Sequence, residues 1–278
     1  MPIFSYLKQS FARKKARRVF QQYDIRVDKF TLTNGEEIEF ANWLNPLVKP
    51  KEITLHEMNF FRQYIPEGSL AIDIGANIGD LTVSMAMAAG ADGLVLALDP
   101  NPHVFRVLEA NAALNRGKAN IVPLRFAVTE EETQFYFASS DASMGNGGLI
   151  TDLNDNRHGK YKLKDPIRGV NLGKYLQEHY MNWLPKLSLI KVDVEGLDYY
   201  VLRSLEPLLE KYHPVIITEV FHDISVEMRE DTFKLLKKYG YKLQDLGDFH
   251  TEAPMPARPV NTLEDMPKMG KTSNLIAS

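Results

Sequence analysis

Residues 71–80 read Ala71-Ile72-Asp73-Ile74-Gly75-Ala76-Asn77-Ile78-Gly79-Asp80, and the organisation of the chain can be read outward from them. An apolar run over 69–72 leads into this stretch, and an amphipathic run over 81–87 leads out of it. This order predicts a buried strand, a glycine-rich turn and the start of a helix. Glycine lacks a Cβ and tolerates positive φ, so such a turn brings the backbone close to a ligand at the helix N-terminus. The stretch therefore predicts a site for a nucleotide-like cofactor.

The residues of this turn argue against a dinucleotide. A dinucleotide-binding turn carries G-x-G-x-x-G, in which the second glycine makes room for the pyrophosphate. Here Asn77 and Asp80 stand at the second and third glycine positions after Gly75. Asp73 and Asp80 also place negative charge where a pyrophosphate would lie. This charge suits S-adenosylmethionine, which has a sulfonium and an ammonium but no phosphate. The alternative is an ordinary strand–turn–helix junction whose glycines serve packing.

A second acid follows at the spacing that a ribose site needs. The apolar run over 93–98 ends in Asp99, about 20 residues after Gly79. A carboxylate at this distance, at the end of the next strand, can bind both ribose hydroxyls. The alternative is an exposed acid at a strand end. The residues that we expect to bind the cofactor are Asp73, Gly75, Ala76, Asn77, Gly79, Asp99, Pro100 and Ala127.

Three motifs together resemble the FkbM family of S-adenosylmethionine-dependent methyltransferases. They are residues 73–79, residues 98–102 and the run Ile190-Lys191-Val192-Asp193-Val194-Glu195-Gly196-Leu197-Asp198, where the family typically has K-x-D-x-E-G. The resemblance covers about residues 30–278 and implies a methyltransferase fold with an antiparallel final strand. It also implies S-adenosylmethionine as the cofactor and a small-molecule or glycan acceptor, with O-methylation of a sugar, glycan or natural product. Asp99 stands where many members have Glu, and Asn171-Leu172-Gly173 lacks an acid that members often carry.

Four polar residues follow the expected strands and are the candidates for catalysis. Asp193 and Glu195 come after the apolar run 187–190, and Glu219 and His222 come at the end of the run 214–220. Ligands of an open parallel sheet lie beyond the carboxyl ends of its strands, so we expect all four to face the methyl-transfer region. A protonated hydroxyl is a poor nucleophile, and a general base typically speeds its reaction about 10²–10⁴-fold. His222 has the unperturbed pKa of such a base.

Each candidate has another interpretation. Asp193 can cap the helix that starts near Gly196, and Glu195 can bind the ammonium of the cofactor. Glu219 can pair with Lys191, and a lone loop histidine such as His222 can be structural. Asp193 and Glu219 could also hold a divalent cation, but their spacing is not diagnostic, and we predict no metal by default.

The rest of the chain predicts a doubly wound α/β fold with a mostly parallel, seven-stranded, Rossmann-like sheet. Strands are expected near 69–74, 93–99, 120–126, 187–193, 214–220, 241–246 and 273–277, with helices between most of them. We assign residues 51–278 to this methyltransferase domain and residues 1–50 to an N-terminal extension. The extension consists of a basic helix and a hairpin around Asn34-Gly35. A strand is also expected near 133–139.

Composition narrows the setting. The chain has 278 residues, no cysteine and a net charge of −3. Disulfides and cysteine metal sites are therefore excluded, and bulk charge does not recruit nucleic acid. No apolar run is long enough to span a bilayer. We expect a cytoplasmic enzyme, and the sequence does not indicate its oligomeric state.

Residues 1–23 carry a separate signal. They hold Lys8, Arg13, Lys14, Lys15, Arg17 and Arg18 and no acid, and Phe4, Leu7 and Phe11 recur at helical spacing. Three interpretations remain: an accessory helix with solvated charges, peripheral contact with a membrane surface or polyanion, or an organelle presequence.

The segments 141–150 and 151–168 are candidate lids or acceptor contacts. Within them Arg157, His158, Lys160 and Lys162 either meet a phosphate of the acceptor or form a solvated charged face. Three alternatives to the enzyme stay open: methylation of nucleic acid or protein, a dinucleotide-dependent oxidoreductase, and a binding module without turnover.

Overall fold

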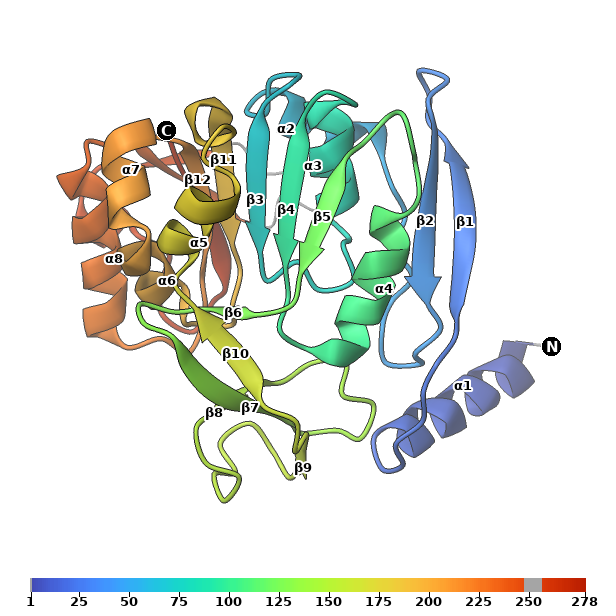
Figure 1. The fold of residues 1–278 in the computed structure, drawn as a ribbon. Coiled ribbons are helices and arrows are strands. Elements are labelled where there is room, and N and C mark those ends of the chain that lie inside the picture. The colour runs from blue at the N-terminus through green and yellow to red at the C-terminus, as the bar shows by residue number, and fades with distance from the viewer. Residues whose placement is uncertain (1, 248–256) are drawn as a thin grey trace.

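The computed structural model describes residues 2–247 and 257–278, with side chains from residue 8 onward. Its main sheet has the strand order β14-β13-β15-β12-β11-β3-β4-β5 (Figure 1). The strands are β3 (Leu70–Ile74), β4 (Leu94–Leu98), β5 (Ile121–Leu124), β11 (Leu187–Val192), β12 (Val215–Val220), β13 (Leu243–Gly247), β14 (Arg258–Val260) and β15 (Ser273–Ala277). Neighbours from β12 to β5 pair in parallel, whereas β15 runs antiparallel to β12 and β13. The doubly wound α/β fold is confirmed, and the short edge strand β14 adds to the seven strands expected.

Helices cover both faces of this sheet, which explains why its central strands are apolar throughout. Every residue of β3 and β4 is buried. Ile72 packs toward one face, whereas its neighbour Ala71 packs toward the other. One face carries α2 (Leu55–Arg62), α3 (Thr82–Ala89) and α4 (Pro102–Ala112), and the other carries α5 (Leu172–His179), α6 (Asp198–Ser204), α7 (Glu206–Tyr212) and α8 (Val226–Lys238). Thr54 caps the N-terminus of α2, because its side chain accepts a hydrogen bond from the Glu57 N–H.

A second, smaller sheet lies beyond the carboxyl ends of β3, β4 and β5 (Figure 1). It consists of β6 (Ala127–Val128), β7 (Thr133–Ser139), β8 (Gly148–Ile150), β9 (Tyr161–Lys162) and β10 (Ile167–Val170). The strand expected near 133–139 is therefore present as β7. The segments 141–150 and 151–168, which the sequence suggested as lids, contain β8, β9 and the start of β10 together with the loops that join them.

The N-terminal extension contains α1 (Pro2–Ala16) and a hairpin of β1 (Ile25–Thr31) and β2 (Glu37–Trp43). The turn lies at Asn34-Gly35 as predicted, and Gly35 has a φ of 86°. The side chains of Asn111 and Asn115 hydrogen-bond to backbone groups of Ala41 and Glu39, which fixes the hairpin to the end of α4. The hairpin shares a hydrophobic core with α2, α3 and α4. The division of the chain into two parts at residue 50 stays a prediction. Among the described residues, no helix has the length and apolar character that crossing a membrane requires.

Candidate active site

A cavity of about 480 Å³ opens where the main sheet faces the smaller one. This volume falls within the range of small-molecule sites. Its walls come from the glycine-rich turn, the ends of β4 and β11, the segment around β6, and the smaller sheet with its loops. The residues that line this cavity include 73–77, Asp80, 98–101, 126–128, Phe135, Phe137, 145–149, Arg157, His158, Lys191 and 193–195.

The glycine-rich turn is clamped between the ends of two strands. The N–H groups of Gly75 and Ala76 both donate to the Leu98 carbonyl at 2.9 Å. Gly75 has a φ of +81°, and a Cβ at this position would lie 1.8 Å from the Asp193 carbonyl oxygen. Only glycine fits between the turn and the end of β11 in this conformation. The turn and the Asp193 strand end are therefore in direct contact, although 118 residues separate them in the chain.

Gly79 has a different role from the one expected. It is not among the residues that line the cavity, although Asp73, Gly75, Ala76, Asn77, Asp99, Pro100 and Ala127 are. A Cβ on Gly79 would lie 3.0 Å from the Leu108 side chain of α4, and the φ of Gly79 is +88°. Gly79 therefore allows α4 to pack closely against the turn rather than a ligand to approach it.

Asp99 holds the turn and the following loop together. Its two carboxylate oxygens accept hydrogen bonds from the N–H groups of Asn77 at 2.9 Å and Asn101 at 2.8 Å. Burial raises the pKa of Asp99 to about 7, against the opposing effect of these two hydrogen bonds. A carboxylate oxygen accepts more than one hydrogen bond, so each retains capacity for a ribose hydroxyl.

A buried lysine connects the two acids at the inner end of the cavity. The Lys191 ammonium lies 3.1 Å from Asp193 and 3.5 Å from Asp73. Lys191 and Asp73 are 3% and 1% exposed, and Asp73 also accepts a 2.6 Å hydrogen bond from the Thr82 hydroxyl. Burial raises the pKa of Asp73 and lowers that of Lys191, but the neighbouring carboxylates outweigh burial and leave the Lys191 pKa raised. Lys191 therefore offsets only part of the negative charge that the turn sequence suggested, because its single ammonium faces Asp73, Asp193 and, further away, Asp80.

Asp193 and Glu195 line the cavity, as the sequence predicts. Asp193 keeps about a third of its side chain exposed while it contacts Lys191. Glu195 has a φ of 54° and Gly196 a φ of 92°, so the chain turns sharply after β11. Burial raises the pKa of Glu195, and the neighbouring Asp193 adds to this effect. A left-handed conformation at a residue other than glycine costs energy and is common at functional sites.

Glu219 and His222 do not line the cavity, which corrects the expectation that all four candidates face it. Glu219 lies in β12, the strand on the far side of β11, and His222 follows this strand and turns outward to the Thr272 hydroxyl at 3.2 Å. One carboxylate oxygen of Glu219 is buried without a hydrogen-bond partner in the described structure. Burial raises the pKa of Glu219 to about 8, and Asp193 adds to the effect. The suggested Glu219–Lys191 pair is absent from the described ion pairs, since Lys191 contacts Asp73 and Asp193.

Asp198 is a structural residue of the site, although the sequence motif that contains it predicted no role for it. It is 3% exposed, and burial raises its pKa to about 7. Its carboxylate accepts hydrogen bonds from the Glu219 N–H and the Thr218 hydroxyl at 3.2 Å, and from the Val194 N–H at 3.4 Å. Asp198 thus joins the ends of β11 and β12. The sequence signal that could have pointed to Asp198 is its position as the last acid of the motif over residues 190–198.

The smaller sheet supplies the outer wall of the cavity. Phe135, Phe137 and the loop 145–149 face it, and the Asn101 side chain donates to the Met144 carbonyl at 2.8 Å. Arg157 and His158 also line the cavity, whereas Lys160 and Lys162 do not. Arg157 pairs with Asp155 and has a side chain that is 71% exposed. The loop is therefore tied to the segment after Asp99, while Arg157 and His158 come from the exposed segment that follows the loop.

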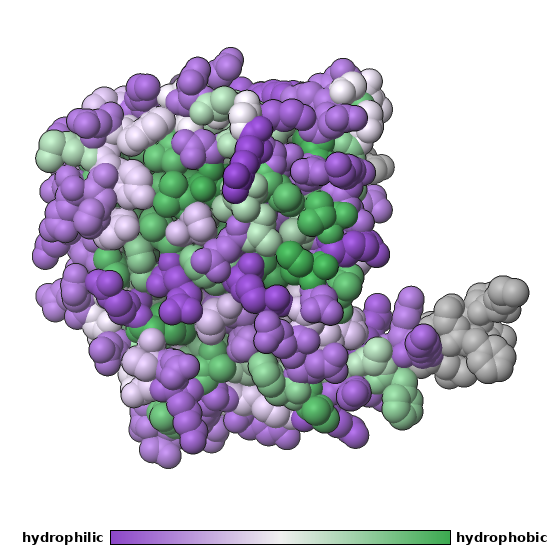
Figure 2. Space-filling model, turned by 45° about the vertical axis from the view of Figure 1, so that its right-hand side comes forward, coloured by the Kyte–Doolittle hydropathy of each residue, from purple (hydrophilic) through white to green (hydrophobic). Residues whose placement is uncertain are grey.

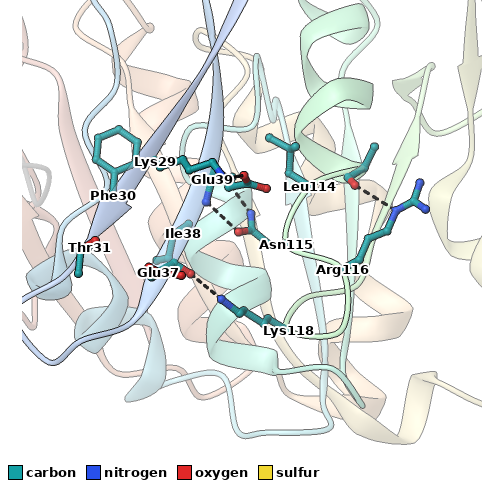
Figure 3. A pocket seen from close by; sticks show the side chains of 11 residues that line it. Lys29, Phe30, Thr31, Glu37, Ile38, Glu39, Leu114, Asn115, Arg116 and Lys118 are labelled. Atoms are coloured by element: carbon teal, nitrogen blue, oxygen red, sulfur yellow. Dashed lines mark hydrogen bonds and ion pairs between the residues drawn. The ribbon is translucent and has the colours of Figure 1, made fainter.

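A second cavity, of about 450 Å³, lies between the hairpin and the end of α4 (Figure 3). Its polar groups are occupied with one another. Asn115 bonds both backbone groups of Glu39, and Lys118 donates to the Glu37 carbonyl (Figure 3). Lys29 also pairs with Glu39. These contacts hold the extension in place, so we assign the chemistry to the cavity at the strand ends.

The residues around that cavity suit S-adenosylmethionine. Asp73 Oδ1 is buried without a hydrogen bond in the described structure, and Asp99 has free acceptor capacity. Phe126, Ala127 and Val128 add an apolar wall. The described residues contain no group of three or more His, Cys, Asp or Glu side chains that could hold a metal ion.

Comparison with known proteins finds sequence similarity to methyltransferases. A family model described as "Methyltransferase FkbM domain" matches residues 73–243 of this chain. The chain is 25% identical over 195 residues to "Methyltransferase 1" of Beauveria bassiana, which covers 65% of this chain and 76% of that protein. It is 28% identical over 152 residues to "Hexuronic acid methyltransferase AglP" of Haloferax volcanii, covering 54% of this chain and 56% of that protein.

A solved structure of methyltransferase FkbM from Methylobacillus flagellatus has 10% sequence identity and a TM-score of 0.43. That alignment covers 80% of this chain and 50% of the other. The match to residues 73–243 spans more than half of the chain, and this protein therefore belongs to the FkbM family of S-adenosylmethionine-dependent methyltransferases.

Proposed function

We propose that this enzyme methylates a hydroxyl oxygen of a sugar, a glycan or a natural product. One observation carries the proposal: the Asp193 carboxylate lies in the same cavity as Asp99 and the glycine-rich turn. The proposed cofactor site and a proton acceptor thus share one space. When bound, S-adenosylmethionine supplies an electrophilic methyl group on a sulfonium.

In this proposal Asp193 is the base. Its carboxylate takes the proton from the acceptor hydroxyl, and Lys191 fixes its orientation from 3.1 Å away. Asp99 binds the ribose hydroxyls through its remaining acceptor capacity. The turn at Gly75 fixes the separation of these two groups, because it contacts both the end of β4 and the end of β11. Positioning of this kind can supply several kcal/mol of the barrier reduction.

Glu195 and Glu219 are two further acids near Asp193, and each has a different role in this proposal. Glu195 lines the cavity next to Asp193, and we propose that it binds the ammonium of the cofactor. Glu219 lies outside the lining and has a raised pKa, so in this proposal it is a neutral neighbour that adds no further charge to Asp193 at neutral pH. His222 turns to Thr272, and we assign it no part in the reaction.

The acceptor class rests on a relative. AglP is described as acting on a hexuronic acid, a sugar that bears a carboxylate. In this chain Arg157 and His158 line the cavity, and the guanidinium of the exposed Arg157 side chain would suit such an acceptor. We therefore place sugars with an acidic group first among the acceptors to be tested.

The test is a methyl-transfer assay with labelled S-adenosylmethionine over uronic acids, neutral sugars, glycans, RNA and protein. We expect methylated sugar or glycan. Asp193→Asn should lower kcat by about 10²–10⁴-fold, because it removes the base. It should still bind S-adenosylhomocysteine, because Asp99 and the turn are unchanged.

Asp92→Asn is the matched control, because Asp92 is exposed at the other end of β4. This variant should retain full activity. Transfer to RNA or protein but to no hydroxyl of a sugar or natural product would refute the proposed acceptor. An Asp193→Asn enzyme as fast as the wild type would remove Asp193 from the reaction.

A further inference from the structure

The N-terminal helix α1 stands out from the body of the protein (Figure 1), and within residues 8–16 its contacts with the body lie near its C-terminal end. Figure 2 shows the described residues of this region at the edge of the molecule. Ala16 is fully buried, and Arg13 donates to the Pro46 carbonyl at 3.3 Å. The carbonyl groups of Arg17 and Arg18 then accept hydrogen bonds from Ala142 at 3.1 Å and Tyr161 at 3.3 Å. Both partners belong to the segment that walls the active-site cavity. The anchor of α1 is therefore continuous with the outer wall of the site.

The side of α1 that points away from this anchor has a distinct composition. Phe11 is 77% exposed, and Lys8, Lys14 and Lys15 are exposed at the positions three before, three after and four after it. Residues three or four apart are neighbours on a helix surface, so the three lysines surround the phenylalanine. We call these four residues the α1 outer face. None of its lysines forms an ion pair within the part of the chain that the structure describes.

Charge is strongly segregated between this segment and the rest of the protein. The whole chain has 33 Lys and Arg and 36 Asp and Glu, and residues 1–23 hold six of the cations and none of the acids. The remaining 255 residues therefore hold 27 cations and 36 acids, a net charge of −9. An anionic surface repels such a body and attracts the segment. Any approach to that surface would accordingly be led by α1.

We propose that the α1 outer face binds an anionic lipid surface. A helix with lysines beside an exposed aromatic residue suits the membrane interface, where the ring enters the headgroup region and the ammonium groups meet lipid phosphates. Val19 and Phe20, which follow the helix, are 52% and 56% exposed, and the Phe20 ring packs edge-on against His103 of the body. The proposal concerns where the enzyme sits and does not depend on which acceptor it methylates.

This surface has a geometric consequence for the enzyme. The helix lies at the same end of the molecule as the carboxyl ends of β3, β4 and β5 and the smaller sheet (Figure 1). Docking through α1 therefore brings the cavity end of the protein toward the membrane. The hydrogen bonds from Ala142 and Tyr161 make the cavity wall part of the same anchored unit.

The test is vesicle flotation of the full chain with two lipid compositions, phosphatidylcholine alone and phosphatidylcholine mixed with phosphatidylserine. We expect binding only to the mixed vesicles, weakening as salt is added. Each lysine near an anionic leaflet contributes a factor of about five to the binding constant. Lys14→Gln combined with Lys15→Gln should therefore weaken binding about 25-fold. Phe11→Ala should weaken it several-fold and should do so at high salt as well.

The matched control is Lys174→Gln combined with Lys242→Gln, which makes the same change in net charge on exposed lysines of the body. It should bind vesicles like the wild type. All variants alter exposed side chains, so each should keep the thermal unfolding midpoint and S-adenosylhomocysteine affinity of the wild type. Equal loss in the control, equal binding to both vesicle types, or no binding at all would overturn the proposal. Binding of an RNA oligonucleotide without binding of vesicles would overturn it in favour of a polyanion surface.

Discussion

Replacing Lys191 with methionine tests whether the buried ion cluster holds the site together. The Lys191 side chain is 4% exposed and lies between Asp73, which is 1% exposed, and Asp193, which is 36% exposed. Without the ammonium, Asp193 can turn to solvent, whereas Asp73 keeps only the hydrogen bond from Thr82. Removing one partner of a buried pair leaves an uncompensated charge and costs about 3–5 kcal/mol. We expect Lys191→Met to lower the free energy of unfolding by that amount.

The measurement is urea unfolding followed by circular dichroism at pH 7. The double variant Lys191→Met/Asp73→Asn removes the stranded charge as well, and it should recover more than half of the loss, because apolar or neutral replacements of buried pairs are often nearly neutral. The coupling between the two positions should then be about 2 kcal/mol or more, near the top of the range for residues in contact. A single variant that loses less than about 1 kcal/mol would refute this reasoning. Additive losses in the double variant would refute it as well.

Three further predictions concern the cavity. Gly75→Ala should destabilise the protein by about 2–5 kcal/mol, because left-handed strain adds to a contact with the Asp193 carbonyl; Gly35→Ala, at a similar φ with open space around it, should cost only about 1–2 kcal/mol in the same urea titration. Asp99→Asn should weaken S-adenosylhomocysteine binding roughly 10–100-fold by calorimetry, because it removes charged hydrogen bonds to the ribose. The affinity of the wild type should rise with pH as Asp99 ionises around its pKa of about 7. An affinity that does not change with pH would count against this role. Burial raises the pKa of Glu219 to about 8. The stability that Glu219 contributes is therefore complete below its unfolded pKa of about 4.3 and is lost as the pH rises toward 8. The Tm of Glu219→Gln should accordingly rise relative to that of the wild type between pH 5 and pH 9, and the opposite trend would contradict the raised pKa.

The sequence predicted much of the main sheet because its signals are local. Each central strand is an apolar run that ends in a turn residue or an acid, as in 93–99, and the hairpin has Asn34-Gly35 at its turn. The spacing of Asp99 after the glycine turn predicted a carboxylate beside that turn, and the structure places Asp99 there, where it accepts a hydrogen bond from the Asn77 N–H. The short strands β8 and β9 were not predicted, since two or three residues carry no periodic pattern.

The sequence was less able to say which side chains reach the cavity. Glu219 and His222 lie at the carboxyl end of β12, much as Asp193 and Glu195 lie at that of β11, yet they lie outside the lining because β12 is one strand further from the glycine turn. Gly79 belongs to the turn motif, but its neighbour is the Leu108 side chain of α4. Contacts of this kind depend on which elements become neighbours, and no local pattern records that.

By itself the sequence determined the doubly wound fold, the glycine-rich turn and the acid at the end of the next strand, because periodicity, glycine positions and strand ends are properties of short segments. Only the tertiary structure showed that Lys191 joins Asp73 to Asp193, that Asp198 joins two strand ends, and that α1 is tied to the cavity wall. The physical reason is that burial decides whether a charge needs a partner. Burial arises when distant segments pack together, so the partner of a buried charge is known only once the chain has folded.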